Sequence, residues 1–377
     1  MKTKYYALAL WALAPALQAA PEVFSGTLGK MPIVVEIDAD GSEATGRYFY
    51  EKFHKDLPLA GTLKGDELAL DEGDRFTDGP KAQLLLKRTN GGWAGQWQGA
   101  KGKQLPVTLA KAQVPPLPDG AGAFMAEQRE KAPYDYLRLL QTPLKPGKQG
   151  SFMGYSLQWL DEPVTGLRMP QLSSGYTDAQ RQRLNAVLRD RLLAEVVTWH
   201  SCQATGGENF DYTQSVAPTY FSASVVSLNI STGYYCGGAH PDAGDSGLSL
   251  SVETGQELTL EDVLWVGDGP ARHFEDGSES KDFDALSQYR EQKLVPWLLK
   301  AFTKLYPSDM EAPKSEDDCD YTDAQVWTFP SWHFTEKGLY LGPYFARVMR
   351  SCESPEWPVL PWAQVNKHPG GARLKLP

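Results

Sequence analysis

The sequence lacks the common signatures of hydrolytic enzymes. It contains six histidines, and none stands in an H-E-x-x-H or H-x-x-x-H arrangement, so zinc hydrolase chemistry of the usual form is not expected. No G-x-S-x-G string is present, which removes the strained serine elbow. A glycosidase needs only two carboxylates placed by the fold, and sequence does not reveal that arrangement. The missing motifs therefore favour a binding protein without removing the enzymatic alternative.

Long apolar runs are missing beyond the first twenty residues. At the start, Lys2 and Lys4 precede an apolar run at 5–13 and a small-residue stretch at 14–20, which is the layout of a secretory signal peptide. The apolar run is shorter than the roughly 20 residues that cross a bilayer. We therefore expect cleavage after Ala19 (signal peptide 1–19) and a periplasmic chain without a membrane span. Because Ala20 is not a cysteine, no lipid anchor is expected.

Positive charge is in short supply. Lysine and arginine number 37 against 47 acidic residues, a net charge of −10, and loss of Lys2 and Lys4 leaves 35 against 47, or −12. Such a surface repels nucleic acid and favours a basic partner where the acids share a face, although it also serves solubility alone. No glycine-rich phosphate loop and no basic patch with interleaved aromatics occurs. We expect no cofactor and no nucleic-acid partner.

Cysteine is scarce and even in number. The four residues are Cys202, Cys236, Cys319 and Cys352, which in an oxidising compartment predict two disulfides. Three pairings are possible, and the nearest-neighbour one, Cys202 with Cys236 and Cys319 with Cys352, needs the shortest loops. A zinc site built from all four thiolates is the alternative, but no C-x-x-C pair supports it.

Residues 20–111 predict an all-β domain. Short alternating runs are separated by turn residues, including the hairpin signals Asp40-Gly41 and Asn90-Gly91, because a type I′ turn needs positive φ at both central positions. We expect an antiparallel meander of eight strands that closes into a small barrel or folds into a sandwich. Gly26, Gly61 and Gly95 each stand two residues before a large apolar side chain, where glycine relieves crowding at a strand bend.

Residues 112–123 are rich in proline and glycine and predict a linker. The remainder, 124–377, predicts an α+β domain with helices packed on an antiparallel sheet. A helical stretch at 124–140 is interrupted at Pro133, and a capping box at Thr177 opens a long amphipathic helix. A second helix at 282–306 is expected to kink at Pro296. Strands are expected in the segments 156–160, 220–230, 248–252, 326–329, 338–341 and 358–362.

A resemblance to a known family rests on residues 234–242 (YYCGGAHPD) and 252–264 (VETGQELTLEDVL). They resemble the Gly-Gly-Ala-His signature and following strands of an extracytoplasmic domain of unknown function, shared by the RsiV anti-sigma factor and the peptidoglycan deacetylase PdaC. The helix opening at Thr177 and the segment 334–344 are similar to that family's helix and C-terminal strands, so the resemblance extends over about residues 150–365.

The resemblance implies a recognition role, because the RsiV member looks like a sensor that binds lysozyme directly. This chain departs from RsiV in lacking a transmembrane anchor and a cytoplasmic sigma-binding segment. Signalling of the RsiV kind is therefore not expected. The expected partner is a basic, lysozyme-like hydrolase that the protein inhibits, or a cell-wall glycan.

The candidate site is the segment with Gly237, Gly238, His240, Asp242 and Asp245. An imidazole with carboxylates two and five positions on suits a divalent ion or a base with its orienting acid. The paired glycines equally indicate a structural tight turn, and a partner-binding loop is the third interpretation. A peptidoglycan hydrolase with a His/Asp site and a purely structural envelope module remain alternatives.

Two tryptophans, Trp357 and Trp362, are expected at the surface. They lie among Pro355, Pro358 and Pro361, and proline-rich segments seldom lie inside sheets. An exposed indole stacks on sugar rings or anchors a protein interface.

Overall fold

The computed structural model describes residues 21–73, 79–274, 282–315 and 318–377, and the expected signal peptide lies outside these ranges. The chain divides into two compact units, 1–113 and 114–377. This division falls within the segment expected to be a linker. None of the helices in the described ranges combines the length and apolar character needed to cross a membrane.

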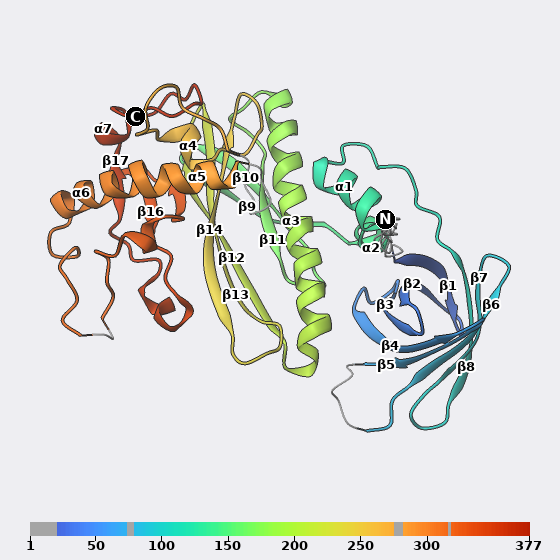
Figure 1. Cartoon of the computed structure of the whole chain (residues 1–377). Helices are drawn as coiled ribbons and strands as arrows, with labels where there is room; N and C mark the ends of the chain where they lie inside the picture. The colour runs from blue at the N-terminus through green and yellow to red at the C-terminus, as the bar shows by residue number, and fades with distance from the viewer. Residues whose placement is uncertain (1–20, 74–78, 275–281, 316–317) are drawn as a thin grey trace, which may run out of the picture. The chain divides into compact units, whose positions relative to one another are not determined.

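The first unit is a closed antiparallel barrel (Figure 1). Its strands, within the described residues, are β1 (Glu22–Leu28), β2 (Met31–Asp40), β3 (Glu43–Tyr50), β4 (Asp56–Lys64), β5 (Glu67–Glu72), β6 (Gln83–Thr89), β7 (Gly92–Gln98) and β8 (Gln104–Lys111). Each pairs with its successor, and β1 pairs with β8. The eight predicted strands are confirmed, and the barrel is the correct one of the two architectures.

Glycine allows the barrel strands to bend. A Cβ on Gly26, Gly61 or Gly95 would overlap a carbonyl oxygen of the neighbouring strand, from Thr108, Ala69 and Leu85 respectively. The predicted relief of crowding is confirmed at all three positions. The barrel interior is filled by alternating apolar side chains, among them Tyr48 and Trp93.

The second unit is α+β, as predicted. Its first part contains α1 (Ala123–Lys131), α2 (Pro133–Gln141), β9 (Lys145–Phe152), β10 (Tyr155–Asp161), β11 (Arg168–Leu172), α3 (Asp178–Gly206) and the 3-10 helix η1 (Gly207–Asn209). It continues with β12 (Asp211–Phe221), β13 (Val225–Tyr235), β14 (Asp242–Ser251), α4 (Leu260–Val263) and α5 (Phe283–Tyr289). A π-helical turn η2 (Arg290–Leu294) leads into α6 (Val295–Leu305). The last elements are η3 (Ala324–Trp327), β15 (Ser331–Phe334), β16 (Gly338–Gly342), η4 (Arg347–Cys352), β17 (Val359–Pro361) and α7 (Trp362–Val365).

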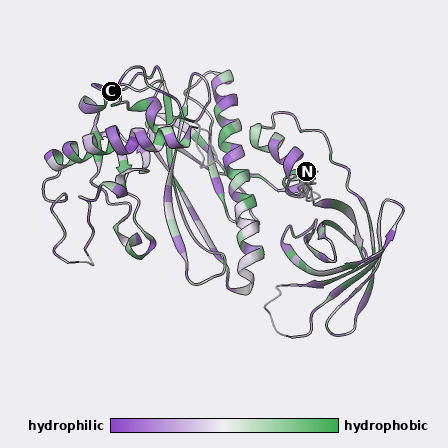
Figure 2. Ribbon diagram, in the orientation of Figure 1, coloured by the Kyte–Doolittle hydropathy of each residue, from purple (hydrophilic) through white to green (hydrophobic). Residues whose placement is uncertain are grey.

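Three antiparallel sheets of three strands form in the described part of this unit, in the orders β11-β10-β9, β12-β13-β14 and β15-β16-β17. Helix α3 begins at the predicted capping box. The Gln180 backbone N–H donates to the Thr177 hydroxyl, and the Thr177 backbone N–H donates to the side-chain oxygen of Gln180. Its apolar residues pack on β10, β11 and one face of β12–β14. Hydrophilic residues lie between them along the helix (Figure 2).

The β15–β17 sheet packs against the β12–β14 sheet near Gly247. A Cβ there would overlap the Trp332 carbonyl oxygen, so only glycine permits this approach. The Phe334 N–H donates to the Ser227 hydroxyl at 3.1 Å, inside the same contact. A separate apolar core gathers α4, α6 and the β15–β17 sheet around the fully buried Trp327 and Phe302.

Three predicted elements are wrong in detail. The strand expected at 220–230 is interrupted by a turn, because the Ser222 hydroxyl accepts from the N–H groups of Ser224 and Val225. The strand expected at 326–329 is instead the 3-10 helix η3, which Asp323 caps. The helix expected at 282–306 does not simply kink at Pro296; it widens into the π-helical turn η2 just before that residue, because proline has no N–H to donate.

Both disulfides form in the predicted nearest-neighbour pairing, Cys202–Cys236 and Cys319–Cys352. Two disulfides in one chain are consistent with an extracytoplasmic protein.

Candidate functional site

The Gly-Gly-Ala-His segment is the loop that joins β13 to β14. Gly237 and Gly238 have φ of 88° and 97°, a region that favours glycine, and the chain bends at both residues. At its start the loop is bonded through Cys236 to Cys202 of α3. A Cβ on Gly237 would lie 3.1 Å from the Thr205 carbonyl oxygen, so the loop lies close against the end of this helix.

His240 is exposed, and its backbone carbonyl rather than its side chain takes part in holding the loop. The Arg347 guanidinium donates to the carbonyl oxygens of His240 at 2.7 Å and Pro241 at 2.9 Å. Among the described residues no carboxylate contacts the His240 imidazole, so the base with an orienting acid, one of the three interpretations of this segment, is not formed by His240 and Asp242. Nor does any group of three His, Cys, Asp or Glu side chains in those ranges have the arrangement of a metal site.

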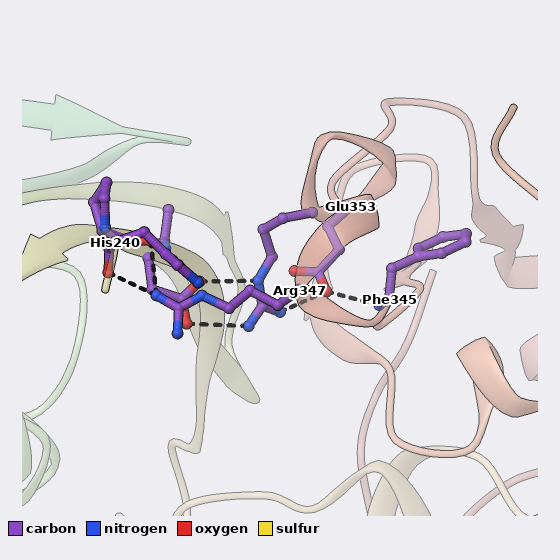
Figure 3. A network of polar contacts seen from close by, with 8 residues as sticks. His240, Phe345, Arg347 and Glu353 are labelled. Carbon is purple, nitrogen blue, oxygen red and sulfur yellow. Dashed lines mark hydrogen bonds and ion pairs between the residues drawn. The ribbon is translucent and has the colours of Figure 1, made fainter. Parts of the chain in front are cut away.

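Arg350 in η4 binds two carboxylates, those of Asp242 and Glu353. Figure 3 shows the polar network to which the labelled His240, Arg347, Glu353 and Phe345 belong. The Nε and Nη2 of Arg350 lie 3.0 and 3.3 Å from the two Asp242 carboxylate oxygens, and its Nη1 lies 2.7 Å from Glu353 Oε1. The same Glu353 oxygen accepts from the Phe345 N–H at 2.7 Å. The hydrogen bond from Arg350 lowers the pKa of Asp242 below its usual range. A charge-assisted pair of this kind fixes both position and orientation.

The loop with Gly237 and Gly238 and the segment 344–354 thus form one surface, which we call the paired-loop face. Each part has its own disulfide, because Cys352 bonds to Cys319. Tyr344 is 58% exposed and Val348 is 91% exposed. An open cavity of about 530 Å³ lies on this face beside Val348, and its lining includes His240 and Arg347.

Asp245 belongs to a second cavity, about 390 Å³ in volume, on the sheet formed by β12–β14. Its carboxylate accepts from the hydroxyls of Ser231 and Ser354 and from the Asn229 amide, the last at 3.1 Å. Burial raises the pKa of Asp245, but these three hydrogen bonds outweigh it and leave the pKa below its ordinary value. Ser354 has a φ of 59°, a strained backbone for a residue other than glycine.

Below this carboxylate lies His333, whose ring stacks on Tyr340 with centroids 4.5 Å apart. Burial lowers the pKa of His333 to about 4, against a smaller opposite effect of Asp245. The partly buried imidazole is therefore neutral at pH 7.

The His333 burial predicts acid sensitivity of the fold. Between pH 6.5 and 4 the unfolded chain binds a proton at His333 and the folded chain does not, so stability falls as the pH falls through that window. From pH 6.5 to 5 this residue should cost about 2 kcal/mol. Denaturant unfolding across this range should show a shallower loss in His333→Phe, which keeps an aromatic ring, while His240→Gln should follow the wild type. Identical slopes in wild type and His333→Phe would contradict the assignment.

The expected surface position is wrong for Trp362, whereas Trp357 is only partly buried. Trp362 is 7% exposed, and its indole lies near the rings of Tyr220 and Phe334. Trp357 is partly buried beside Phe302, in the apolar core of α4, α6 and the β15–β17 sheet. Pro358 precedes the short strand β17 and Pro361 ends it, yet the next residue, Trp362, is buried.

Sequence reasoning missed the residues that hold the site together. The His240 carbonyl is bound by Arg347, and the Asp242 carboxylate is bound by Arg350, which also pairs with Glu353. The surroundings of Asp245 include the Ser354 hydroxyl and the His333 ring. A visible signal was the pair of arginines three positions apart just before Cys352, because a disulfide-held segment with two fixed cations suits a network of this kind. No alternation or spacing in the sequence indicated its partners.

No protein family model matches this sequence, and no curated protein matches it.

Proposed function

We propose that this protein is a periplasmic binding protein that captures a basic protein of the cell wall, with a lysozyme-type hydrolase as the expected partner. The observation that carries the proposal is the paired-loop face. Its backbone is held by two disulfides and by the contacts of Arg347 and Arg350, while the His240, Tyr344 and Val348 side chains stay exposed. Protein recognition benefits from such preorganisation, because little conformational entropy is lost on binding.

Exposed apolar side chains on a fixed loop support a contact with protein. Val348 lies in the first turn of the 3-10 helix η4, and almost its whole side chain is in solvent. It therefore buries almost no apolar surface in the fold. The neighbouring Tyr344 ring lies over the Arg350 guanidinium at 5.0 Å. Tyrosine and arginine are enriched at the energetic centres of interfaces.

Charge supports a basic partner. The chain carries a net charge of −10. The described part of the segment that the second disulfide joins to η4 contains one exposed lysine, Lys314, against four exposed acids: Asp309, Glu311, Asp318 and Asp323. A negative field beside the paired-loop face would speed the encounter with a cationic protein and lose strength as salt is added. The resemblance of residues 234–242 to the RsiV domain supports lysozyme as the first partner to test.

A test of the proposal is lysozyme binding by calorimetry at low salt, together with an assay of cell-wall lysis. We expect binding and inhibition by the wild type. Val348→Glu should weaken binding about ten-fold or more, because it places a charge at the apolar centre of the contact, and should leave thermal stability unchanged.

The matched control is Phe53→Glu, which alters an exposed apolar residue of the barrel and should bind like wild type. No binding of lysozyme or of a resident wall hydrolase at low salt would overturn the proposal, and equal affinity of Val348→Glu would remove the paired-loop face from it.

A further inference from the structure

The cavity beside Asp245 has a floor on the face of β12–β14 that α3 does not cover. Side chains alternate between the two faces of a strand. Ile230 packs in the core beneath α3, so its neighbour Ser231 faces the cavity, together with its cross-strand partners Ser215 and Asp245. The wall comes from the end of η4 and the residues after it, with Arg350, Glu353 and Ser354.

Asp245 lines this cavity without a cationic partner. Its three hydrogen-bond donors, Ser231, Asn229 and Ser354, are all neutral, and no lysine or arginine of the described residues forms an ion pair with it. A half-buried carboxylate whose hydrogen-bond donors are all neutral is costly compared with one beside a lysine or arginine. An incoming cation would therefore gain a strong interaction here.

Arg350, the arginine among the residues that line the cavity, does not act as a counterion for Asp245. Arg350 already binds two carboxylates, Asp242 and Glu353. Of the residues that line the cavity, the charged ones are Asp245, Glu353 and Arg350, which leaves a net charge of −1. The other lining groups include the hydroxyls of Thr213, Ser215 and Ser231, which accept from N–H donors.

We propose that this cavity receives a lysine or arginine side chain of the basic partner, with Asp245 as its counterion. The inference rests on the proposed function and deepens it by naming the group that the partner contributes. An alkylammonium has three N–H donors and a guanidinium five. The carboxylate and the surrounding hydroxyls are enough to satisfy either.

The test uses small cations in place of the partner, with the full chain. n-Butylammonium and n-butylguanidinium chloride stand for the two side chains, and n-butylurea is the neutral isostere. NMR titration should show saturable binding of at least one cation and none of the urea. Asp245→Asn should weaken cation binding about ten-fold or more, because an amide cannot act as counterion.

Glu356→Gln is the matched control, because it removes an exposed carboxylate that does not line the cavity, and it should bind the cations like wild type. The thermal midpoint of Asp245→Asn shows whether the variant folds, and Ser231→Ala, which alters a neighbouring cavity group, should give a smaller loss in the same direction. Absence of cation binding, equal binding by Asp245→Asn, or equal binding of n-butylurea would overturn the inference. Cation binding through Asp245 without capture of any basic protein would retain the site and overturn the protein partner.

Discussion

Arg290→Met is expected to lower the free energy of unfolding by about 3 to 5 kcal/mol, as removal of one partner from a buried ion pair does. Arg290 begins the π-helical turn η2 and binds Glu261 of α4 through two bonds, Nε to Oε1 at 2.8 Å and Nη2 to Oε2 at 3.1 Å. The side chains are 11% and 1% exposed. Methionine fills similar volume but leaves the Glu261 carboxylate buried without its counterion. Chemical denaturation at pH 7 measures the loss.

The control for this prediction lies in the same turn. Lys293 pairs with Asp268 at 2.8 Å, but these side chains are 46% and 93% exposed, so Lys293→Met should cost less than about 1 kcal/mol. The double variant Arg290→Met with Glu261→Leu should recover part of the loss, because no buried charge remains. Equal effects of Arg290→Met and Lys293→Met would show that the Glu261 contact contributes no more than a surface pair.

The second large effect is expected from the disulfide that holds η4. Replacing both Cys319 and Cys352 by alanine opens a loop with a sequence separation of 33, and the chain-entropy relation gives a loss of about 3 to 4 kcal/mol. Cys352 is also the last residue of η4, and its carbonyl accepts from the Tyr321 hydroxyl at 3.0 Å. Because this disulfide fixes the segment that carries Val348, partner binding should weaken as well.

The other disulfide provides the comparison. Cys202 and Cys236 have a sequence separation of 34, so their removal should cost a nearly equal amount if chain entropy decides. Calorimetric unfolding of both double variants measures this. A loss below about 1 kcal/mol for Cys319→Ala with Cys352→Ala would show that the segment is held by its other contacts, Arg350 with Asp242 above all.

Local pattern was enough to predict the eight-stranded meander but not its closure into a barrel, because each strand depends on alternation and on turn residues next to it in sequence, whereas closure depends on the pairing of β1 with β8. It also predicted the turn at Gly237 and Gly238 and the helix that begins at Thr177. The extent of β13 was missed, because the turn that precedes it depends on the Ser222 hydroxyl within a sequence that alternates almost without a break.

The centre of the candidate site was not predictable in this way. Arg350 and Asp242 are 108 positions apart, and nothing in either local sequence indicates the other. Trp362 shows the same limit, because nearby prolines indicated a surface segment whereas the surrounding rings come from Tyr220 and Phe334. Contacts that the whole fold brings together are decided by packing between distant segments.

The closure of the first unit determines how that unit can meet other molecules. Since β1 pairs with β8 from Phe24 to Leu28, each barrel strand has a neighbour on both sides, so a partner cannot attach there by adding a strand of its own. The sheets of the second unit do have outer strands, such as β9 and β12. Recognition by the barrel must therefore use side chains and turns, since none of its described strands leaves an edge open for pairing.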